Sequence, residues 1–308
     1  MSADKPPHLF CFGYGYSCDY LAQALRANRV WKISGTTRDP EKRTQMQEHG
    51  IAAHIFDFHQ PLSDPARALD GVTHLLISTP PDDSGDPAFM LHEDDIVRLK
   101  SLQWIGYLSS TGVYGDRDGG WVDEDSALRP TTKRGSRRVR AEQQYLSLFE
   151  DYDLPVHIFR LAGIYGPGRS ALDSVRAGVA RRIDKPGHAF SRIHVDDIVN
   201  VLMASMAHPR PGRAYNVCDD NAVPSHEVIK YACELLGLTV PPLIPYSEVD
   251  LAPITRSFYS DNKRIKNDRI KTELGLTLKH PDYTSGLRAC LEMEQKITSF
   301  IATENPGG

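Results

Sequence analysis

Near its start the chain passes directly from an apolar strand into a glycine-containing turn and then into a helix. The apolar run covers 9–12, the turn covers 13–18, and a helix-forming stretch covers 19–27. Gly13 permits a tight turn, and Gly15 lets backbone N–H groups approach a pyrophosphate, whose charge is favoured at the positive end of a helix. This succession predicts a dinucleotide-binding corner. Its expected contacts are Gly13, Gly15, Tyr16 and Ser17, with Cys18 as the small third residue of the pattern.

The end of the second predicted strand, 30–36, discriminates between two dinucleotides. An NAD site usually places a carboxylate there, which accepts hydrogen bonds from the ribose 2′-OH. This chain instead has Thr36, Thr37 and Arg38, and a guanidinium can hold a 2′-phosphate through two hydrogen bonds. The residues therefore favour NADP over NAD. The alternative is an ordinary turn with a solvated arginine.

Composition limits the class of protein and its partners. The chain has 308 residues, of which 40% are hydrophobic and 25% charged, so it can form one large domain or two modest ones. A net charge of -4 gives no reason to expect nucleic acid or an acidic membrane surface as a partner. No apolar run approaches the roughly 18 residues of a bilayer span. Five scattered cysteines fit no disulfide framework and no metal site, so we expect a cytoplasmic protein with reduced thiols.

The first part of the chain alternates between apolar runs of strand length and helical patterns. This alternation predicts a Rossmann-type α/β fold, in which helices cover both faces of a doubly wound parallel sheet. The expected strands are 8–13, 30–36, 51–57, 73–79, 103–109 and 155–161, and the expected helices are 17–27, 41–49, 64–69, 88–100 and 134–150.

After residue 166 the alternation breaks, which predicts a second and smaller lobe. A helix is expected at 193–207 and a short strand at 214–217, and a proline-rich segment joins the helices that follow. The expected division is a cofactor domain of 1–166 with returning segments at about 191–220, a smaller and mainly helical lobe of 167–190 and 221–301, and a frayed tail of 302–308.

Ligands of such sheets bind beyond the carboxyl ends of the strands, so the loops after the strands hold the candidate contacts. Asp57 is expected to contact the adenine, and the alternative is an ordinary loop carboxylate. The further cofactor contacts expected after the third, fourth and fifth strands are Phe58, Ser78, Thr79, Pro80 and Ser109.

Several later segments, in the same order along the chain, carry a family resemblance. They are the strand and small-residue turn at 104–115, the helix containing 134–142, and the segments 159–168, 193–198, 260–263 and 274–275. Together they resemble the extended short-chain dehydrogenase/reductases, the group that contains nucleotide-sugar epimerases and dehydratases. The resemblance covers almost the whole chain.

The resemblance implies an active site of a Ser/Thr, a Tyr and a Lys. The Ser/Thr orients the reacting oxygen, the Tyr transfers its proton, and the Lys lowers the Tyr pKa and holds the nicotinamide ribose. On this chain these positions fall on Ser110, Arg134 and Arg138, the last of which remains a candidate for holding the ribose. A guanidinium does not release its proton in proteins, so Arg134 cannot supply the acid/base role, which is worth about 10²–10⁴-fold in rate. We therefore expect an atypical member of the group.

Three other side chains are candidates for the missing acid: Tyr114, Tyr165 and His194. Each tyrosine belongs to a Tyr-Gly pair just past a strand, and an imidazole titrates near neutrality. The alternative for the tyrosines is that they anchor their turns. The alternative for His194 is that it packs beneath a helix that Asp196 caps.

Basic side chains crowd the start of the second lobe. Arg169 and Arg192 are the candidate contacts for an anionic small-molecule substrate, although a solvated helix face would have the same composition. The basic run 133–140 lacks interleaved aromatic residues, so no nucleic-acid partner is expected. Many relatives pair through the helix that 134–150 would form, so the resemblance implies a homodimer.

Two functions are compatible with these residues. The first is an NADP-dependent oxidoreductase or epimerase that acts on a sugar nucleotide or a related polar alcohol or carbonyl, and Ser110 and the basic second lobe favour it. The second is a catalytically inactive NADP-binding module with a regulatory or redox-sensing role, and Arg134 favours it. Of the two, the enzyme is the preferred interpretation.

Overall fold

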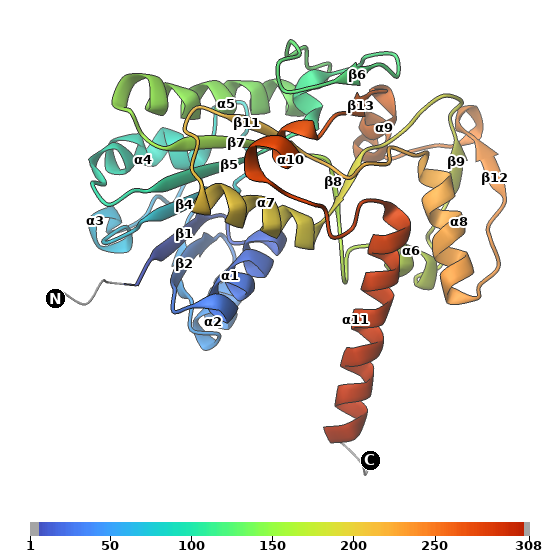
Figure 1. The fold of residues 1–308 in the computed structure, drawn as a ribbon, viewed down its shortest axis with the longest axis horizontal. Helices are drawn as coiled ribbons and strands as arrows, with labels where there is room; N and C mark the ends of the chain where they lie inside the picture. Colours follow the sequence, from blue (N-terminus) through green and yellow to red (C-terminus); the bar gives the residue numbers. More distant parts are fainter. Residues whose placement is uncertain (1–5, 305–308) are drawn as a thin grey trace.

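A computed structural model describes residues 6–304, and its largest element is a seven-stranded sheet (Figure 1). The order of strands across the sheet is β11 (Ala214–Val217), β7 (Val156–Leu161), β5 (Trp104–Ser110), β4 (His74–Ile77), β1 (His8–Phe12), β2 (Lys32–Thr37) and β3 (Ala52–Ile55). Every adjacent pair is parallel. The chain winds outward from β1 in both directions, so the predicted Rossmann-type fold is confirmed.

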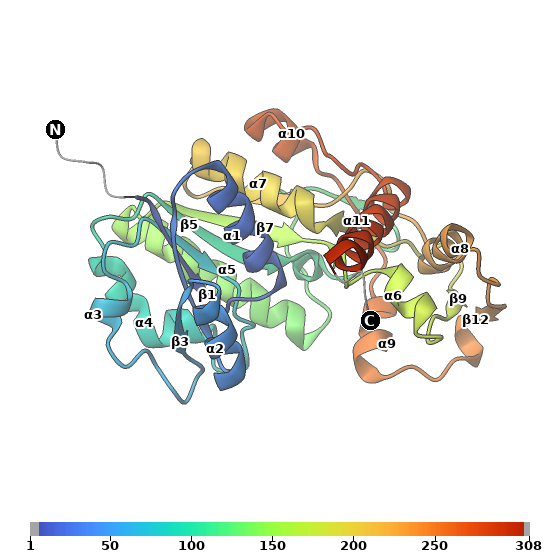
Figure 2. The same ribbon diagram turned by 90° about the horizontal axis from the view of Figure 1, so that it is seen from below.

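Helices cover both faces of the sheet (Figure 2). One face carries α1 (Tyr16–Asn28), α2 (Pro40–Glu48), α7 (Val195–Ala207) and α10 (Asp268–Leu274), and the other carries α3 (Pro65–Ala68), α4 (Pro87–Arg98) and α5 (Lys133–Tyr152). Successive residues of a strand point to opposite faces. Accordingly, Leu9 and Cys11 of β1 belong to one core cluster, and Phe10 and Phe12 belong to the other.

Three of the flanking helices begin with an Asp-Pro pair. In α2, α3 and α4 the aspartate is the N-cap and accepts hydrogen bonds from N–H groups of the first turn, and the proline follows as the first helical residue. Proline is suited to this position because its fixed φ matches the helix and its missing N–H would have no partner there. The aspartates Asp39, Asp64 and Asp86 therefore fix where these helices start.

Most predicted elements are present with small shifts at their ends, and one predicted helix boundary is wrong. The helix predicted at 193–207 starts later, because residues Arg192–His194 form strand β10, which pairs with β8 (Gly163–Tyr165). His194 is the N-cap of α7, so the backbone that precedes the helix is extended. Residues 302–304 of the predicted tail belong to α11 (Tyr283–Glu304), and 305–308 lie outside the described residues.

The smaller lobe contains α6, α8, α9, β9, β12 and most of α11 (Figure 1). Its elements are α6 (Ala171–Arg176), β9 (Arg182–Asp184), α8 (Ser225–Leu236), β12 (Leu243–Pro245), the short 3-10 helix η2 (Tyr246–Glu248) and α9 (Pro253–Ser260). Strands β6 (Trp121–Val122) and β13 (Arg264–Ile265) pair with each other, and a 3-10 helix, η1 (Thr111–Tyr114), follows β5.

One segment that was predicted for the smaller lobe lies with the sheet instead. Ile270 and Leu274 of α10 belong to the same core cluster as Leu202 of α7, so α10 is part of the cofactor domain. Within residues 6–304, no helix has the combination of length and apolar character that crossing a membrane would need.

Buried histidines in the sheet make stability depend on pH. Burial lowers the pKa of His8, His74 and His157 from 6.5 to about 4 in each case. As the pH falls from 6.5 toward 4, these side chains take up protons in the unfolded chain and not in the folded one. The free energy of unfolding should therefore be highest above about pH 6.5 and should fall through this range.

His157 offers a direct test of this dependence. Its Nε2 accepts a hydrogen bond from the Arg210 N–H at 2.8 Å, which requires a neutral ring. In His157→Gln, the loss of unfolding free energy between pH 7 and pH 5 should shrink by about 2 kcal/mol. Urea unfolding at the two pH values measures it, with the exposed His208→Gln as control. An unchanged loss in His157→Gln would contradict the prediction.

Candidate active site

The glycine corner lies at the carboxyl end of β1. Gly13 has a φ of +80°, and a Cβ there would lie 3.0 Å from the backbone nitrogen of Thr79. Gly15 is the N-cap of α1, and within the described part of the chain no side chain caps this helix. Its first-turn N–H groups can therefore bind an external acceptor such as a pyrophosphate. The corner has the conformation and the open donors that a dinucleotide needs.

At the end of β2, the two threonines and the arginine differ in what their side chains contact. The Thr36 hydroxyl oxygen accepts a hydrogen bond from the Gly13 N–H at 2.8 Å, and that of Thr37 accepts one from the Asp39 N–H at 3.1 Å. Both threonines are buried, whereas Arg38 is exposed. Thr36 therefore shapes the glycine corner, and Arg38 is the member of the three whose side chain is exposed.

Three other predicted cofactor contacts already have protein partners. Asp57 accepts hydrogen bonds from two N–H groups of its own turn, at 2.7 and 2.9 Å. The Thr79 hydroxyl donates to Asp86 at 3.2 Å, and the Ser109 hydroxyl donates to Glu142 at 2.5 Å. Contacts from these residues to a cofactor would therefore come mainly from their backbones. For Tyr16, Ser17, Phe58, Ser78 and Pro80, cofactor contact stays a prediction.

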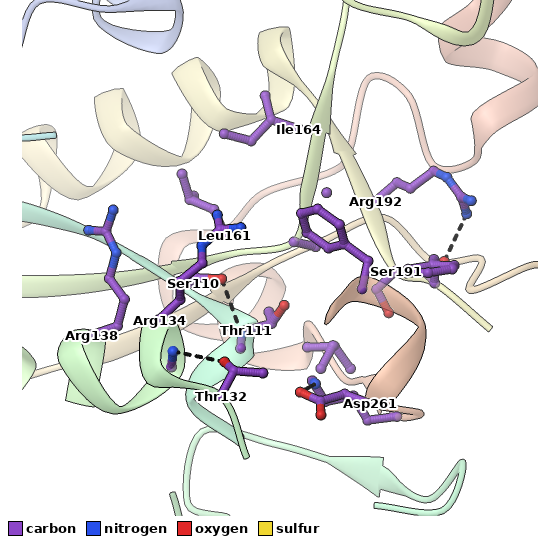
Figure 3. A pocket seen from close by; sticks show the side chains of 18 of the residues that line it. Ser110, Thr111, Thr132, Arg134, Arg138, Leu161, Ile164, Ser191, Arg192 and Asp261 are labelled. Carbon is purple, nitrogen blue, oxygen red and sulfur yellow. Dashed lines mark hydrogen bonds and ion pairs between the residues drawn. The ribbon is translucent and has the colours of Figure 1, made fainter. Parts of the chain in front are cut away.

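A cavity of about 570 Å³ lies at the carboxyl edge of the sheet, where the smaller lobe meets it (Figure 3). This is within the usual range of about 300–1,000 Å³ for small-molecule sites. The cofactor domain lines it with Pro80, Ser110, Thr111, Arg134, Arg138 and Leu161, and the opposite wall includes Phe190, Ser191, Arg192, Ser225, Tyr259 and Lys263. The pocket thus joins loops at the carboxyl ends of the strands and the start of α5 to residues from 190 onward in the chain.

Cationic side chains dominate the cavity wall. Arg134, Arg138, Arg192 and Lys263 line it, and Asp261 is the carboxylate among the described lining residues. Asp261 is paired with Lys263 at 3.2 Å, so the three arginines account for the net charge of the wall. An anionic or strongly polar ligand is therefore favoured there.

Ser110 has a hydroxyl that is able to donate into this cavity. The side chain is the N-cap of η1, where its oxygen accepts a hydrogen bond from the Gly112 N–H at 3.1 Å. Because that bond uses only a lone pair, the hydroxyl proton stays available for a ligand oxygen. Figure 3 shows the side chain beside those of Thr111 and Arg134.

The two arginines of α5 that line the cavity, Arg134 and Arg138, have different environments. Arg138 is half-buried, and its Nη1 donates to the carbonyl oxygen of Leu108 at 2.7 Å and to the Tyr107 hydroxyl at 2.9 Å. Arg134 is exposed, and its guanidinium carbon lies 5.6 Å from the centre of the Phe258 ring on α9. Arg138 is therefore held against the end of β5, whereas Arg134 reaches across the cavity toward the smaller lobe.

A buried ion pair next to this site was missed by the sequence-based reasoning. Glu142 of α5 and Arg160 of β7 lie 2.9 Å apart, and their side chains are 1% and 7% exposed. Glu142 also accepts the Ser109 hydroxyl, and Arg160 donates to the Tyr114 hydroxyl at 2.9 Å. The pair therefore ties together α5, η1 and the two strands whose ends line the cavity.

The reactive atoms of the three candidate acids are hydrogen-bonded to other parts of the protein. Tyr114 is fully buried and does not line the cavity; its hydroxyl donates to Asn216 at 2.7 Å, and burial raises its pKa to about 12. Tyr165 lines the cavity, but its hydroxyl donates to the Asp282 carbonyl at 3.3 Å, and burial raises its pKa well above the usual value. Both geometries match the expected alternative of tyrosines that anchor their turns.

His194 also lies outside the cavity lining. Its Nδ1 accepts a hydrogen bond from the Asp196 N–H at 3.1 Å, so His194 itself caps α7, a role that the sequence had assigned to Asp196. Burial lowers the His194 pKa to about 4. The ring is therefore a neutral helix cap.

His194, Asp196 and His280 do come together, with possible metal-ligand atoms within 4.8 Å of one another. Two of those atoms already have partners. The Asp196 carboxylate lies 2.6 Å from Lys279 Nζ and 3.1 Å from His280 Nε2. His194 Nδ1 accepts a hydrogen bond from the Asp196 N–H at the start of α7. An ammonium group at this position competes directly with a cation, so the cluster is organised as a helix start that is tied to the 279–280 segment.

The structure places the two predicted substrate arginines in different parts of the protein. Arg192 lines the cavity. Arg169 does not; its guanidinium carbon lies 5.7 Å from the ring centre of Tyr16, whose hydroxyl donates to the Pro167 carbonyl at 3.0 Å. Tyr16 is the first residue of α1, so Arg169 lies beside the glycine corner and at the cofactor end of the protein.

The sequence of the cofactor domain matches a family model over residues 13–218, and this model describes the NAD dependent epimerase/dehydratase family. The chain belongs to this family. The matched residues include the glycine corner, Ser110, Arg134 and Arg138, so the match covers the wall of the cavity that the cofactor domain provides.

Two relatives share sequence with this chain over most of its length. Protein YeeZ of Escherichia coli K12 is 30% identical over 286 residues, which cover 88% of this chain and 95% of that protein. A conserved protein of unknown function from Silicibacter pomeroyi DSS is 50% identical, with a TM-score of 0.86 over 93% of this chain and 98% of its own.

More distant structures share the fold. The dTDP-glucose 4,6-dehydratase of Bacillus anthracis, solved in complex with NAD, has a TM-score of 0.73 and 17% identity over 94% of this chain and 97% of its own. At this identity the likeness concerns the fold alone.

Proposed function

We propose that the protein is an NADP-dependent oxidoreductase or epimerase that acts on a polar alcohol or carbonyl, with sugar nucleotides among the candidate substrates. The observation that supports this most directly is that Ser110, Arg134 and Arg138 line one cavity at the carboxyl edge of a dinucleotide-binding sheet. A built cavity with an oriented hydroxyl donor is more than a cofactor-binding module needs.

The residues present fit a dinucleotide. Gly13, Gly15 and the start of α1 would hold the pyrophosphate, Arg38 would hold a 2′-phosphate, and Arg138 would hold the nicotinamide ribose. A bound nicotinamide would supply or accept the hydride. Arg138 suits the ribose because three protein oxygens hold its Nη1 and the three N–H groups on Nε and Nη2 remain for other acceptors.

The substrate oxygen would be stabilised by fixed donors. In our proposal the Ser110 hydroxyl donates to that oxygen, and the Arg134 guanidinium stabilises the negative charge that develops on it during reduction. Arg134 keeps its own proton, so the proton that completes the alcohol comes from solvent. This arrangement departs from the tyrosine acid that the family resemblance implies.

The proposal is tested by incubating the full chain with NADPH or NADP and a panel of nucleotide sugars, simple aldehydes, ketones and polyols. Nicotinamide absorbance follows net turnover, and product chromatography detects an epimerisation that leaves the cofactor unchanged. Turnover of at least one compound is expected. Tight NADPH binding with no turnover across the panel would support the alternative of an inactive NADP-binding module, which Arg134 favours.

The preference for NADP has its own test at Arg38. Loss of a charge-assisted pair to the 2′-phosphate should raise the Kd of NADPH by about 10–100-fold in Arg38→Ala. NADH lacks that phosphate, so its Kd should change by less than about threefold. Fluorescence titration measures both, and the exposed Arg67→Ala on α3 is a control of equal charge. Equal losses for the two cofactors would contradict the assignment.

A further inference from the structure

Resting on the proposed function, we propose that Arg192, Ser191 and Ser225 form an oxyanion subsite in the cavity, which holds a carboxylate or phosphate group of the substrate. Figure 3 shows Arg192 and Ser191 on the opposite side of the view from Arg138. The substrate would then carry its anionic group at one end and its reacting alcohol or carbonyl at the other, beside Ser110.

Arg192 is held rigidly and keeps donors for a ligand. Its Nη1 donates to the carbonyl oxygens of Phe190 and Val223 at 2.9 and 3.0 Å, and its Nη2 donates to the Ser225 hydroxyl at 3.1 Å. A guanidinium has five N–H groups, so one on Nε and one on Nη2 remain. Bonds to backbone oxygens fix the direction in which these two point, which lowers the entropy cost of binding.

The charge of Arg192 is not cancelled by a neighbour. No carboxylate in the described part of the chain lies within ion-pair distance of it; all of its bonding partners given above are neutral oxygens. Asp219 is the carboxyl that acts on it electrostatically, and burial raises the Asp219 pKa to about 8. Burial thus weakens the negative charge that Asp219 offers to Arg192. A charge that is removed from water needs a counter-charge, and the cavity is where one can enter.

Two hydroxyl residues extend the same site. The Ser191 oxygen is buried and has no hydrogen-bond partner among the described residues, although the side chain lines the cavity. Ser225 also lines the cavity and is the first residue of α8, a helix of 12 residues whose N-terminus has no side-chain cap. An anion here would satisfy the serine hydroxyl and meet the positive end of the helix.

The surrounding wall strengthens these contacts. Tyr259 is buried and Phe190 is half-buried, and both line the cavity beside Arg192. The Arg192 guanidinium carbon lies 5.7 Å from the centre of the Phe190 ring. Apolar rings exclude water, and charge–charge attraction is stronger where water is excluded. The site therefore fits a compact oxyanion.

Calorimetric titration of the full chain with inorganic phosphate, and separately with acetate, tests the subsite without any need for turnover. Saturating NADPH is added in a parallel titration, because it fills the glycine corner and removes phosphate binding there. We expect one of the two anions to bind, and we expect Arg192→Gln to weaken that binding at least tenfold. Which of the two anions binds more tightly distinguishes a phosphate site from a carboxylate site.

Three further variants make the outcome decisive. Ser225→Ala should weaken the anion several-fold, Arg192→Lys should bind it less tightly than the wild type, and Lys230→Gln on the exposed side of α8 should have no effect. Circular dichroism confirms folding, and Arg192→Lys and Ser225→Ala carry the test if Arg192→Gln does not fold. Unchanged binding in these variants, or no anion binding by the wild type, would overturn the subsite. Neither result bears on whether NADPH is turned over, so the two proposals fail separately.

Discussion

Replacement of Glu142 by alanine should lower the free energy of unfolding by about 3–5 kcal/mol. The carboxylate accepts hydrogen bonds from Arg160 Nε and Nη2, the latter at 2.9 Å, and from the Ser109 hydroxyl at 2.5 Å. Its removal leaves a guanidinium that is 7% exposed without a counter-charge. This loss of unfolding free energy comes mainly from the unpaired buried charge of Arg160. The intact ion pair adds little net stability, because its attraction largely offsets the cost of removing both charges from water.

Urea unfolding followed by circular dichroism measures this effect. Glu150→Ala on the same helix is the matched control, because that side chain is exposed, and its unfolding free energy should change by less than about 0.5 kcal/mol. The double variant Glu142→Leu with Arg160→Met removes both charges and should be more stable than Glu142→Ala. A loss below about 1 kcal/mol in Glu142→Ala would show that the ion pair does not hold the strands and α5 together as described.

This ion pair could not have been found from the sequence. Glu142 stands in a helix whose exposed face is also charged, so its residue type carries no sign of burial. Its partner Arg160 lies 18 positions away, near the end of a mostly apolar strand, and Ser109 lies 33 positions away on another strand. Only the packing of α5 across β5 and β7 brings the three together.

The sheet, by contrast, could be predicted because its signals are local. Each central strand is an apolar run that is bounded by turn residues, and Gly13 adopts a positive φ that few other residues would accept. Carboxyl ends of parallel strands meet at one edge, so the sequence alone is enough to expect that Ser110 and Pro80 share a site. The predicted helix start at residue 193 was wrong because His194 caps α7 through a ring nitrogen, which is not among the usual capping groups.

The far wall of the cavity was predicted only in part from the sequence. Arg192 was predicted as a substrate contact from its charge, whereas Ser191, Ser225, Tyr259 and Lys263 were not predicted to contact a ligand. They come from the residue before β10, from α8, from α9 and from the segment before β13, which have no common pattern and meet only through tertiary packing. For this wall, the charge of Arg192 predicted an anionic ligand, but only the fold shows which residues lie beside Arg192.

If the proposed reaction is correct, Ser110→Ala should lower kcat/KM by about 10²–10³-fold, which is the usual effect of removing one fixed donor to a developing oxyanion. The hydroxyl is placed for this role because its oxygen is already occupied by the Gly112 N–H, so its proton is directed to another acceptor. Ser110→Thr keeps the hydroxyl and should retain most of the activity. Since Ser110 also caps η1, Ser110→Ala should cost about 1 kcal/mol of stability, too little to account for the loss of turnover.

Steady-state rates with the substrate identified by the panel, together with NADPH titration, separate binding from chemistry. The Kd of NADPH should stay within about threefold of the wild type in Ser110→Ala, because the cofactor contacts proposed above do not depend on this side chain. Ser136→Ala is the control, since that hydroxyl is exposed on α5 and bonds only to the Thr132 carbonyl among the described groups. A Ser110→Ala protein with unchanged kcat/KM would exclude the hydroxyl as the donor to the substrate oxygen, and the Arg134 guanidinium would then be the remaining cavity donor proposed for that charge.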